Sequence, residues 1–203
     1  MQPPQVLAIV LASGASLRMG GADKLLLPVD GQPMLRRVAA AFHASRCVET
    51  RVILPQGADL RHRALGELDL AVFENTDAGE GMAAAIRCGV AGPPPDTDGV
   101  IVGLGDMPDI TAADVDSLIT GFDPSRPRMI CRAATEDGRP GNPVLFAKAH
   151  FPALARLRGD RGARDLLSAN AAWVTPVPLP GRRAVTDIDT QEDWARYQAR
   201  APG

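Results

Sequence analysis

The sequence has few of the residues that mark metal-binding, disulfide-bonded or nucleic-acid-binding proteins. Its three cysteines, Cys47, Cys88 and Cys131, lie far apart without a C-x-x-C pair, and its three histidines never fall at metal-ligand spacing. We therefore expect neither a zinc site nor a disulfide framework. Aromatic residues make up 4% of the chain and the formal net charge is −2, so the basic stripe and stacking surface of a nucleic-acid-binding protein are not expected.

Long apolar runs are also missing. None reaches the roughly 18 residues that a membrane span needs. The start, Met1 to Pro4, lacks the basic and apolar regions of a signal peptide. We expect a cytoplasmic protein with a small-molecule partner and no membrane partner. The 203 residues, 45% of them hydrophobic, suffice for a single domain with one large buried core.

Apolar strands and amphipathic helices alternate along the first 122 residues. The predicted strands are Val6 to Ala12, Val48 to Leu54, Leu70 to Phe73 and Gly99 to Leu104. The predicted helices begin at Pro33 and cover Ala58 to Gly66, Gly79 to Val90, and the segment that Thr111 caps through Ile119. This alternation predicts a mostly parallel α/β sheet covered by helices on both faces, with ligands at the carboxyl ends of the strands.

The alternation of strands and helices becomes less regular after residue 122. The predicted strands there are Met129 to Ala133, Val144 to Phe146, Ala172 to Pro178 and Val185 to Ile188, with a loop over Thr135 to Pro143. Two short helices are expected within 148–157 and 161–169, and a last one is capped by Thr190 and Asp193. We interpret residues 5–122 as the nucleotide-binding part and residues 123–203 as the acceptor-binding part of this domain.

The segment after the first strand, Leu11 to Lys24, reads L-A-S-G-A-S-L-R-M-G-G-A-D-K and is rich in small residues. Its backbone amides can bind phosphate oxygens, while Arg18 and Lys24 supply two positive charges for a triphosphate. It matches neither G-x-x-x-x-G-K-[ST] nor G-x-G-x-x-G, so an ordinary ATPase and a dinucleotide dehydrogenase are both disfavoured. A purely structural Gly-rich turn is the alternative interpretation.

Carboxylates follow two of the later strands. Asp106, in Gly105 to Pro108, has no adjacent Lys or Arg, and such a carboxylate can bind Mg²⁺ together with substrate phosphates. Capping of the Pro108 turn is the alternative role. Asp187 and Asp189 stand two residues apart near the end of the last predicted strand, and Asp189 lies next to the helix cap and nearer the strand end. We favour Asp189, although this segment could serve only as a helix cap.

Three segments carry a resemblance to a known family: the Gly-rich segment after the first strand, Gly105 to Pro108, and the segment with Asp187 and Asp189. Together they make the chain similar to the molybdenum-cofactor cytidylyltransferases of the MobA-like nucleotidyltransferase superfamily, over residues 6–197. Gly138 to Pro143 resembles the R-G-[HN]-P signature of the cytidylyl branch, and Gly159 to Arg164 resembles a late helix start of that family. The first motif alone is shared with sugar-nucleotide and isoprenoid nucleotidyltransferases. The segment Gly79 to Ala85 departs from the family because alanines stand where a serine is frequent.

The resemblance implies a Rossmann-like three-layer fold, CTP and Mg²⁺ as co-substrate and metal, and molybdopterin as acceptor. The products would be a cytosine dinucleotide cofactor and pyrophosphate. Transient contact with a molybdoenzyme or its chaperone is also expected. Because a phosphate monoester is already anionic near neutral pH, catalysis needs positioning and charge neutralisation rather than a strong general base.

The resemblance also assigns residues to the site. The catalytic set is Arg18, Lys24 and Asp106, and the metal ligands are Asp106 and Asp189. The nucleotide-binding set is Leu11, Ala12, Ser13, Gly14, Arg18, Lys24, Gly81, Met82 and Asp106, of which Gly81 and Met82 would act through backbone amides at a helix start. The acceptor-binding set is Arg139, Gly141, Asn142 and Arg161.

Three other functions stay open at this point. The same chemistry could use GTP with molybdopterin, or CTP with a sugar or polyol phosphate. A non-catalytic carrier that binds the finished cofactor for molybdoenzymes is a different class of protein. The carrier is disfavoured because it needs neither the cations of a triphosphate site nor a metal-binding carboxylate such as Asp106.

Overall fold

The central strand of the fold is β1, Val6–Leu11, and every one of its residues is buried. We describe residues 3–200 of the chain from a computed structural model. Alternate side chains of β1 point to opposite faces of the sheet, so that Ala8 packs in one hydrophobic cluster and Ile9 in the other. A continuous apolar run of this kind fits a parallel strand that is covered on both faces.

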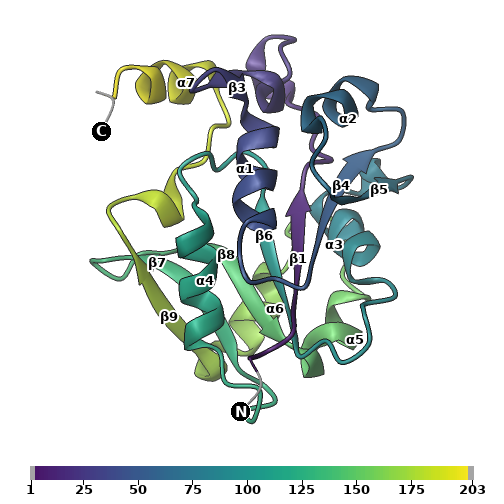
Figure 1. Cartoon of the computed structure of the whole chain (residues 1–203), viewed down its shortest axis with the longest axis vertical. Helices are drawn as coiled ribbons and strands as arrows, with labels where there is room; N and C mark the ends of the chain where they lie inside the picture. The colour runs from purple at the N-terminus through teal and green to yellow at the C-terminus, as the bar shows by residue number, and fades with distance from the viewer. Residues whose placement is uncertain (1–2, 201–203) are drawn as a thin grey trace.

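Seven strands form one sheet in the order β5-β4-β1-β6-β8-β7-β9 (Figure 1). The other strands are β4 Glu49–Pro55, β5 Ala71–Asn75, β6 Gly99–Leu104, β7 Ile130–Thr135, β8 Pro140–Ala147 and β9 Val174–Leu179. Only β8 among them runs antiparallel to its neighbours, so the mostly parallel sheet is confirmed. The chain moves outward from β1 to β5 and then returns to β6 on the other side of β1. The carboxyl ends of β1 and β6 therefore form a topological switch point.

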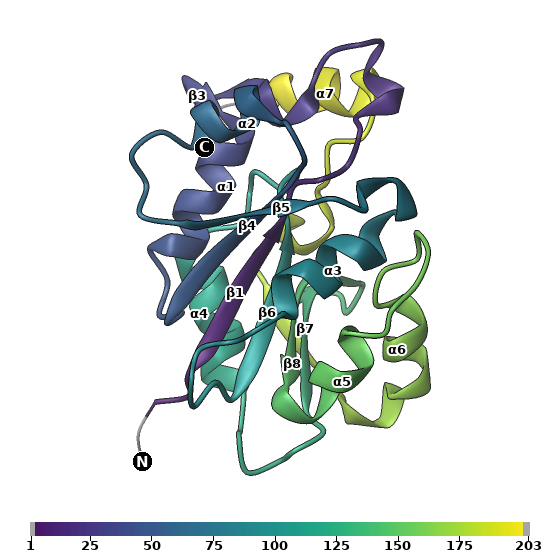
Figure 2. The same cartoon turned by 90° about the vertical axis from the view of Figure 1, so that its right-hand side faces the viewer.

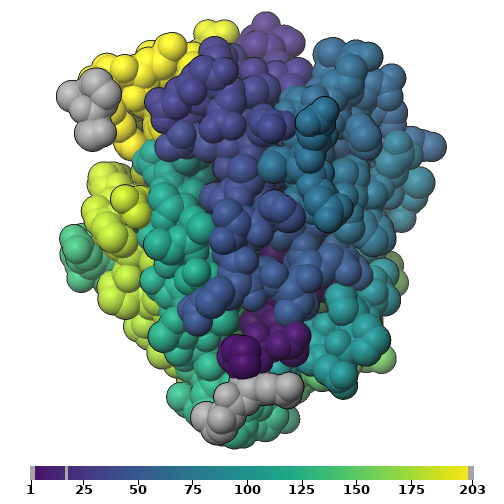
Figure 3. All heavy atoms as spheres, in the orientation of Figure 1, coloured from purple at the N-terminus to yellow at the C-terminus, as the bar shows by residue number. Residues whose placement is uncertain are grey.

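Helices cover both faces of the sheet, as expected for the three-layer fold (Figure 2). The face shown in Figure 3 is covered by α1 Met34–His43 and α4 Ala112–Gly121. The opposite face carries α3 Met82–Val90, α5 Phe151–Leu154 and α6 Arg164–Ala169. Two further helices, α2 Asp59–Leu65 and α7 Gln191–Gln198, lie toward the carboxyl end of β1. Within residues 3–200, no helix is long and apolar enough to cross a membrane.

Shorter elements complete the chain. The hairpin of β2 Pro28–Val29 and β3 Gln32–Pro33 packs near α7. Six 3₁₀ turns are described, and they are η1 Leu17–Met19, η2 Lys24–Leu26, η3 Ala78–Glu80, η4 Lys148–His150, η5 Ala171–Trp173 and η6 Arg183–Val185. The first two of these turns lie in the Gly-rich loop that follows β1.

Local sequence signals predicted several element boundaries correctly. The strand Gly99–Leu104 has the bounds that its apolar run indicated. The capping boxes at the starts of α4 and α7 are both present, with Thr111 paired to Asp114 and Thr190 paired to Asp193. The helix predicted from Gly79 begins three residues later, at Met82, because Gly81 has a φ of 87° and cannot continue a helix.

Two predictions about the second half were wrong. The predicted loop over 135–143 is partly strand, because β8 begins at Pro140 and pairs with β7 through a register shift between Arg132 and Ala134. The predicted strand Val185 to Ile188 does not form. The neighbouring strand β6 already has β1 and β8 on its two sides, so this segment makes only a local contact, from the amide of Ile188 to the carbonyl of Asp106 at 3.0 Å.

Gly141 in β8 provides a test of this packing. A Cβ atom at this position would lie 1.8 Å from the carbonyl oxygen of Ala184, which belongs to the backbone of η6 and cannot move aside. We expect Gly141→Ala to lower the free energy of unfolding by about 3 kcal/mol, as overpacking of a well-filled core does. Urea unfolding measures this change. Gly121→Ala is the control, because its new methyl group meets Val177 at an ordinary 3.5 Å and should change stability little.

Candidate active site

A cavity of about 490 Å³ lies at the switch point, where the loop after β1 faces the end of β6. Its volume is in the range of small-molecule sites. Eight of the nine predicted nucleotide-binding residues line it, and they are Leu11, Ala12, Ser13, Gly14, Lys24, Gly81, Met82 and Asp106. Arg18 does not line the cavity and contacts Asp189 beside it.

The loop after β1 is held in shape by an arginine that the sequence analysis missed. Arg61 of α2 is only 6% exposed, and its Nη1 and Nη2 atoms donate to the carbonyl oxygens of Ala12 at 2.6 Å and Gly14 at 2.8 Å. Its Nε donates to Asp23 Oδ2 at 2.7 Å. Arg61 stands four residues before Leu65 on the buried face of α2. A cation at an apolar position of an amphipathic helix was the signal that could have revealed it.

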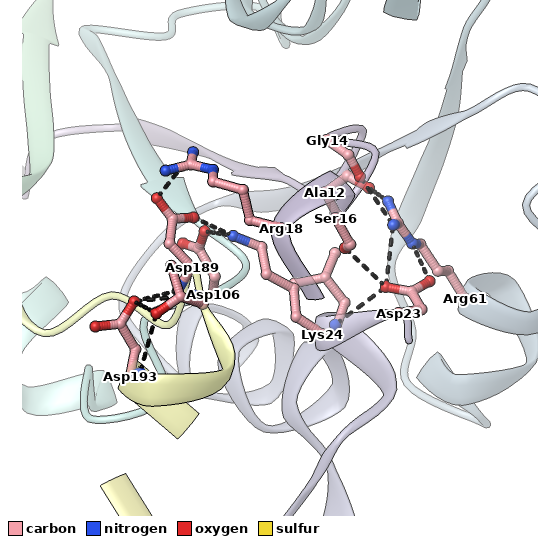
Figure 4. A network of polar contacts seen from close by, with 12 residues as sticks. Ala12, Gly14, Ser16, Arg18, Asp23, Lys24, Arg61, Asp106, Asp189 and Asp193 are labelled. Atoms are coloured by element: carbon pink, nitrogen blue, oxygen red, sulfur yellow. Dashed lines mark hydrogen bonds and ion pairs between the residues drawn. The ribbon is translucent and has the colours of Figure 1, made fainter. Parts of the chain in front are cut away.

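Lys24 connects the loop to two distant carboxylates (Figure 4). Its Nζ lies 2.6 Å from Asp106 Oδ2 and 2.5 Å from Asp189 Oδ1. Asp106 has no Lys or Arg adjacent to it in the sequence, but the folded chain gives it a cationic partner. The partner stands 82 residues away in the sequence and reaches Asp106 only because β1 and β6 are adjacent in the sheet. Contacts this short between a buried ammonium and carboxylates are charge-assisted hydrogen bonds.

Asp189, rather than Asp187, reaches Lys24. Asp189 also pairs through Oδ2 with Arg18 Nη2 at 3.3 Å, although the Arg18 side chain is 72% exposed. The contact between Ile188 and Asp106 fixes this part of the chain next to the end of β6. Asp187 is exposed. The geometry thus agrees with the preference for Asp189 over Asp187, while a role in metal binding stays a prediction.

Burial and pairing act in opposite directions on these charges. Burial raises the pKa of Asp106 above its usual range, and the nearby charge of Lys24 only partly offsets this effect. Burial alone would lower the pKa of Lys24, but the charges and hydrogen bonds of Asp106 and Asp189 raise it, so Lys24 remains an ammonium. The second oxygen of Asp106, Oδ1, is buried without a hydrogen-bond partner among the described residues. A buried, unsatisfied carboxylate oxygen is costly unless a ligand completes it.

This arrangement fits a divalent cation that is completed by substrate. In the part of the chain that the structure describes, no group of three or more His, Cys, Asp or Glu side chains could hold a metal ion. Asp106 and Asp189 can supply two carboxylate ligands, and the free Oδ1 of Asp106 faces no competing donor. One or two carboxylates together with substrate phosphates is the donor set that Mg²⁺ usually takes.

The four predicted acceptor-binding residues are not all together. Asn142 and Arg161 line a second cavity of about 100 Å³, which shares Leu11, Met82 and Leu104 with the first. Arg139 is exposed in the turn between β7 and β8 and lines neither cavity. Gly141 is buried beneath the backbone of η6 and also lines neither, so the structure gives it a packing role.

The segment Gly159 to Arg164, which the sequence analysis singled out, closes over the start of α3. The carbonyl of Gly159 accepts from the amide of Ala83 at 3.1 Å, and Asp160 lines the first cavity. Arg164 lines the second cavity, as does Arg132 of β7. Neither arginine was among the predicted site residues. Arg132 was missed because a single cation within a predicted strand was read as part of that strand.

The doubly wound sheet, with a Gly-rich loop after β1 and a Lys-carboxylate centre at its switch point, is the arrangement that the sequence predicted for a nucleotidyltransferase. The family model of the MobA-like NTP transferase domain matches residues 8–173, and the chain belongs to this family.

Individual relatives span nearly the full chain. Nicotine blue oxidoreductase of Paenarthrobacter nicotinovorans is 25% identical over 197 residues, which cover 95% of this chain and 96% of that protein. Molybdenum cofactor guanylyltransferase of Serratia proteamaculans is 28% identical over 199 residues, 96% of this chain and 94% of that one. The crystal structure of Rv0371c from Mycobacterium tuberculosis H37Rv has a TM-score of 0.82 at 29% identity and covers 98% of this chain and 100% of its own. A structure of Rv0371c in complex with manganese has a TM-score of 0.73 at 30% identity, over 95% of this chain and 97% of its own.

Replacement of Arg61 tests how the loop is held. Arg61→Met keeps the apolar stem but leaves the carbonyls of Ala12 and Gly14 without this donor and Asp23 without its ion-pair partner. We expect a loss of about 2 to 4 kcal/mol in unfolding free energy and a nucleotide Kd raised about tenfold. Chemical unfolding and nucleotide titration measure the two effects. Arg63→Met, an exposed position on the same helix, should change neither, and an unaltered Arg61→Met protein would show that the loop holds its shape unaided.

Proposed function

We propose that the protein transfers CMP from CTP to the terminal phosphate of molybdopterin and releases pyrophosphate. The observation that carries the nucleotidyl-transfer part is the contact of Lys24 with both Asp106 and Asp189 beside the phosphate loop. A centre of this kind brings cations and metal-binding carboxylates to the point where an α-phosphate and its pyrophosphate leaving group must be neutralised.

The residues of the chain bind and orient the two substrates. The loop from Ala12 to Gly14, with the amides at the start of α3, binds the triphosphate through backbone groups. Arg18 and Lys24 neutralise the charge that grows on the leaving pyrophosphate as the acceptor phosphate attacks in line. The attacking phosphate monoester needs no strong base, which is consistent with a cavity lined by neither histidine nor cysteine among residues 3–200.

Asp106 and Asp189 would hold the Mg²⁺ ion, which supplies Lewis-acid stabilisation of the phosphate oxygens when bound. The manganese complex of Rv0371c supports a divalent cation in this family. The ammonium of Lys24 lies between the same two carboxylates. Binding of one cation by both carboxylates would require Lys24 to turn away, and the triphosphate would offer the anionic partner that Lys24 then needs.

The choice of substrates rests on the sequence. Gly138 to Pro143 and Gly159 to Arg164 resemble the cytidylyl branch, while the molybdenum cofactor guanylyltransferase of Serratia supports a molybdenum-cofactor acceptor with a different base. GTP as the nucleotide and a sugar or polyol phosphate as the acceptor are the alternatives within the same chemistry. Contact with a molybdoenzyme or its chaperone, and a cytoplasmic location, belong to this proposal as well.

Two alternatives lie outside nucleotidyl transfer. One relative is named as an oxidoreductase, and a non-catalytic cofactor carrier would also bind a nucleotide. Neither hydride transfer nor cofactor carriage has a leaving pyrophosphate to neutralise, which is the task that Lys24 beside Asp106 and Asp189 suits. Release of pyrophosphate only when nucleotide and acceptor are present together would distinguish nucleotidyl transfer from an oxidoreductase and from a cofactor carrier.

Asp106→Asn tests the proposed centre. We expect pyrophosphate release to fall about 10²-fold or more, and Mn²⁺ binding in the presence of CTP to weaken, because an amide cannot replace a carboxylate ligand. The unfolding free energy should change little, since the amide oxygen can still accept from Lys24 and Asp189 stays paired. The exposed Asp187→Asn variant should resemble the parent in both assays. A severe loss of stability with normal Mn²⁺ dependence would make Asp106 a structural residue.

The nucleotide is tested by a direct comparison of CTP and GTP. We expect kcat/KM to be at least about tenfold higher with CTP, because a base that leaves buried hydrogen-bonding groups unpaired is rejected by several kcal/mol. Pyrophosphate release with molybdopterin as acceptor measures both rates. Equal or faster reaction with GTP would place the protein in the guanylyl branch.

A further inference from the structure

Arg132 occupies an unusual position in the sheet. It lies within β7, between β8 and β9, and pairs in register with Val144 and Pro176. The residue two positions earlier on the same face, Ile130, is fully buried in the hydrophobic cluster beneath α6. The pattern of this face calls for another apolar residue at position 132. A partly buried cation in such a place is informative because desolvation of a charge is costly without a partner.

The hydrogen bonds of Arg132 leave most of its donors unused. Its Nε donates to the carbonyl oxygen of Gly141 at 3.0 Å. Its two terminal nitrogens have no hydrogen-bond or ion-pair partner in the described part of the chain. A single bond to a carbonyl could be made by a shorter, neutral side chain. The terminal guanidinium atoms therefore do more than hold β8.

A second arginine faces the same small cavity. Arg164, at the start of α6, has an exposed side chain without an ion-pair partner among residues 3–200. No carboxylate of the described residues lines this cavity, and the third arginine that lines it, Arg161, is paired with Asp165 at 3.0 Å. Burial, together with the charge of Arg164, lowers the pKa of Arg132. Two like charges that share a cavity without a counter-charge repel one another until an anion arrives.

The size and lining of the cavity indicate the kind of anion. A cavity of about 100 Å³ accommodates a phosphate-sized group. Planar guanidinium groups bind phosphate oxygens in pairs, and the apolar floor formed by Val102, Val144 and Phe146 strengthens such contacts by excluding water. Both cavities are lined by Leu11, Met82 and Leu104. A group held in the small cavity therefore lies next to the cavity of about 490 Å³, which we call the nucleotide cavity because the proposed function assigns it to the nucleotide.

We propose that Arg132 and Arg164 bind the phosphate monoester of the acceptor and place it beside the nucleotide cavity. This inference rests on the proposed function, because it takes the acceptor to be a phosphate monoester. It adds two residues to Asn142 and Arg161, which line the same cavity, and it replaces Arg139, which does not. The acceptor is thus recognised by its anionic group from β7 and α6, whatever the remainder of the molecule is.

The first experiment measures binding of inorganic phosphate without any reaction. We expect phosphate to raise the Tm of the parent protein more than chloride at equal ionic strength. Arg132→Gln and Arg164→Gln should each lose about half of that rise, because the loop with Lys24 forms a second phosphate site and retains the remainder. Lys24→Gln should lose the part of the rise in Tm that comes from the loop site and keep the part that comes from Arg132 and Arg164. Arg139→Gln, an exposed arginine outside both cavities, should respond like the parent.

The second experiment separates binding of the two substrates. With molybdopterin and CTP, Arg132→Gln and Arg164→Gln should raise the KM for the acceptor about tenfold or more and leave the KM for CTP within about twofold. If the two arginines served only in packing, their replacement would lower stability and change the KM for the acceptor and the KM for CTP together. The exposed Arg164 keeps the test valid if Arg132→Gln folds poorly.

Two results would overturn the inference. One is a full phosphate-dependent rise in Tm in both arginine variants, and the other is an unchanged acceptor KM in an enzyme that is otherwise active. Failure of the proposed function is distinguishable, because phosphate binding at Arg132 and Arg164 would then remain while no acceptor supports pyrophosphate release.

Discussion

The ion pairs of Lys24 with Asp106 and Asp189 unite three parts of the chain that the sequence keeps far apart. The largely buried Asp106 carboxylate would be unfavourable there without the ammonium, and the largely buried ammonium would be unfavourable without a carboxylate. The loop after β1, the end of β6 and the segment before α7 are therefore held together by mutual neutralisation. The switch point supplies the adjacency of β1 and β6 that allows these contacts.

Arg61 stabilises the same region by binding backbone carbonyl groups as well as the carboxylate of Asp23. Arg61 occupies the carbonyl oxygens of Ala12 and Gly14, which fixes the loop from the side opposite to Lys24 (Figure 4). The loop needs such support because it contains left-handed residues, including Ser16 with a φ of 51°. The site is thus preorganised by α2 and α7 as well as by the strands, and a preorganised set of donors is what electrostatic catalysis requires.

The second cavity, which Arg132 and Arg164 line, adjoins the larger cavity that Lys24 and Asp106 line. The antiparallel strand β8 joins β6 to β7, and this places Arg132 and the start of α6 beside the residues that line the nucleotide cavity. The two cavities share an apolar boundary at Leu11, Met82 and Leu104. Under the proposed function the two substrates lie side by side, and the sheet topology rather than any single motif creates this arrangement.

The sequence by itself determined the α/β class, the strand at 99–104, both capping boxes and the segments that carry the phosphate loop and Asp106. These features depend on periodicity, capping and short motifs, which act over a few residues. Only the tertiary structure decided that Lys24 pairs with Asp106, that Arg61 supports the loop, that β8 starts at Pro140 and that Arg139 lies outside the cavities. Such contacts join residues tens of positions apart, and no local pattern encodes which distant side chains a sheet will bring together.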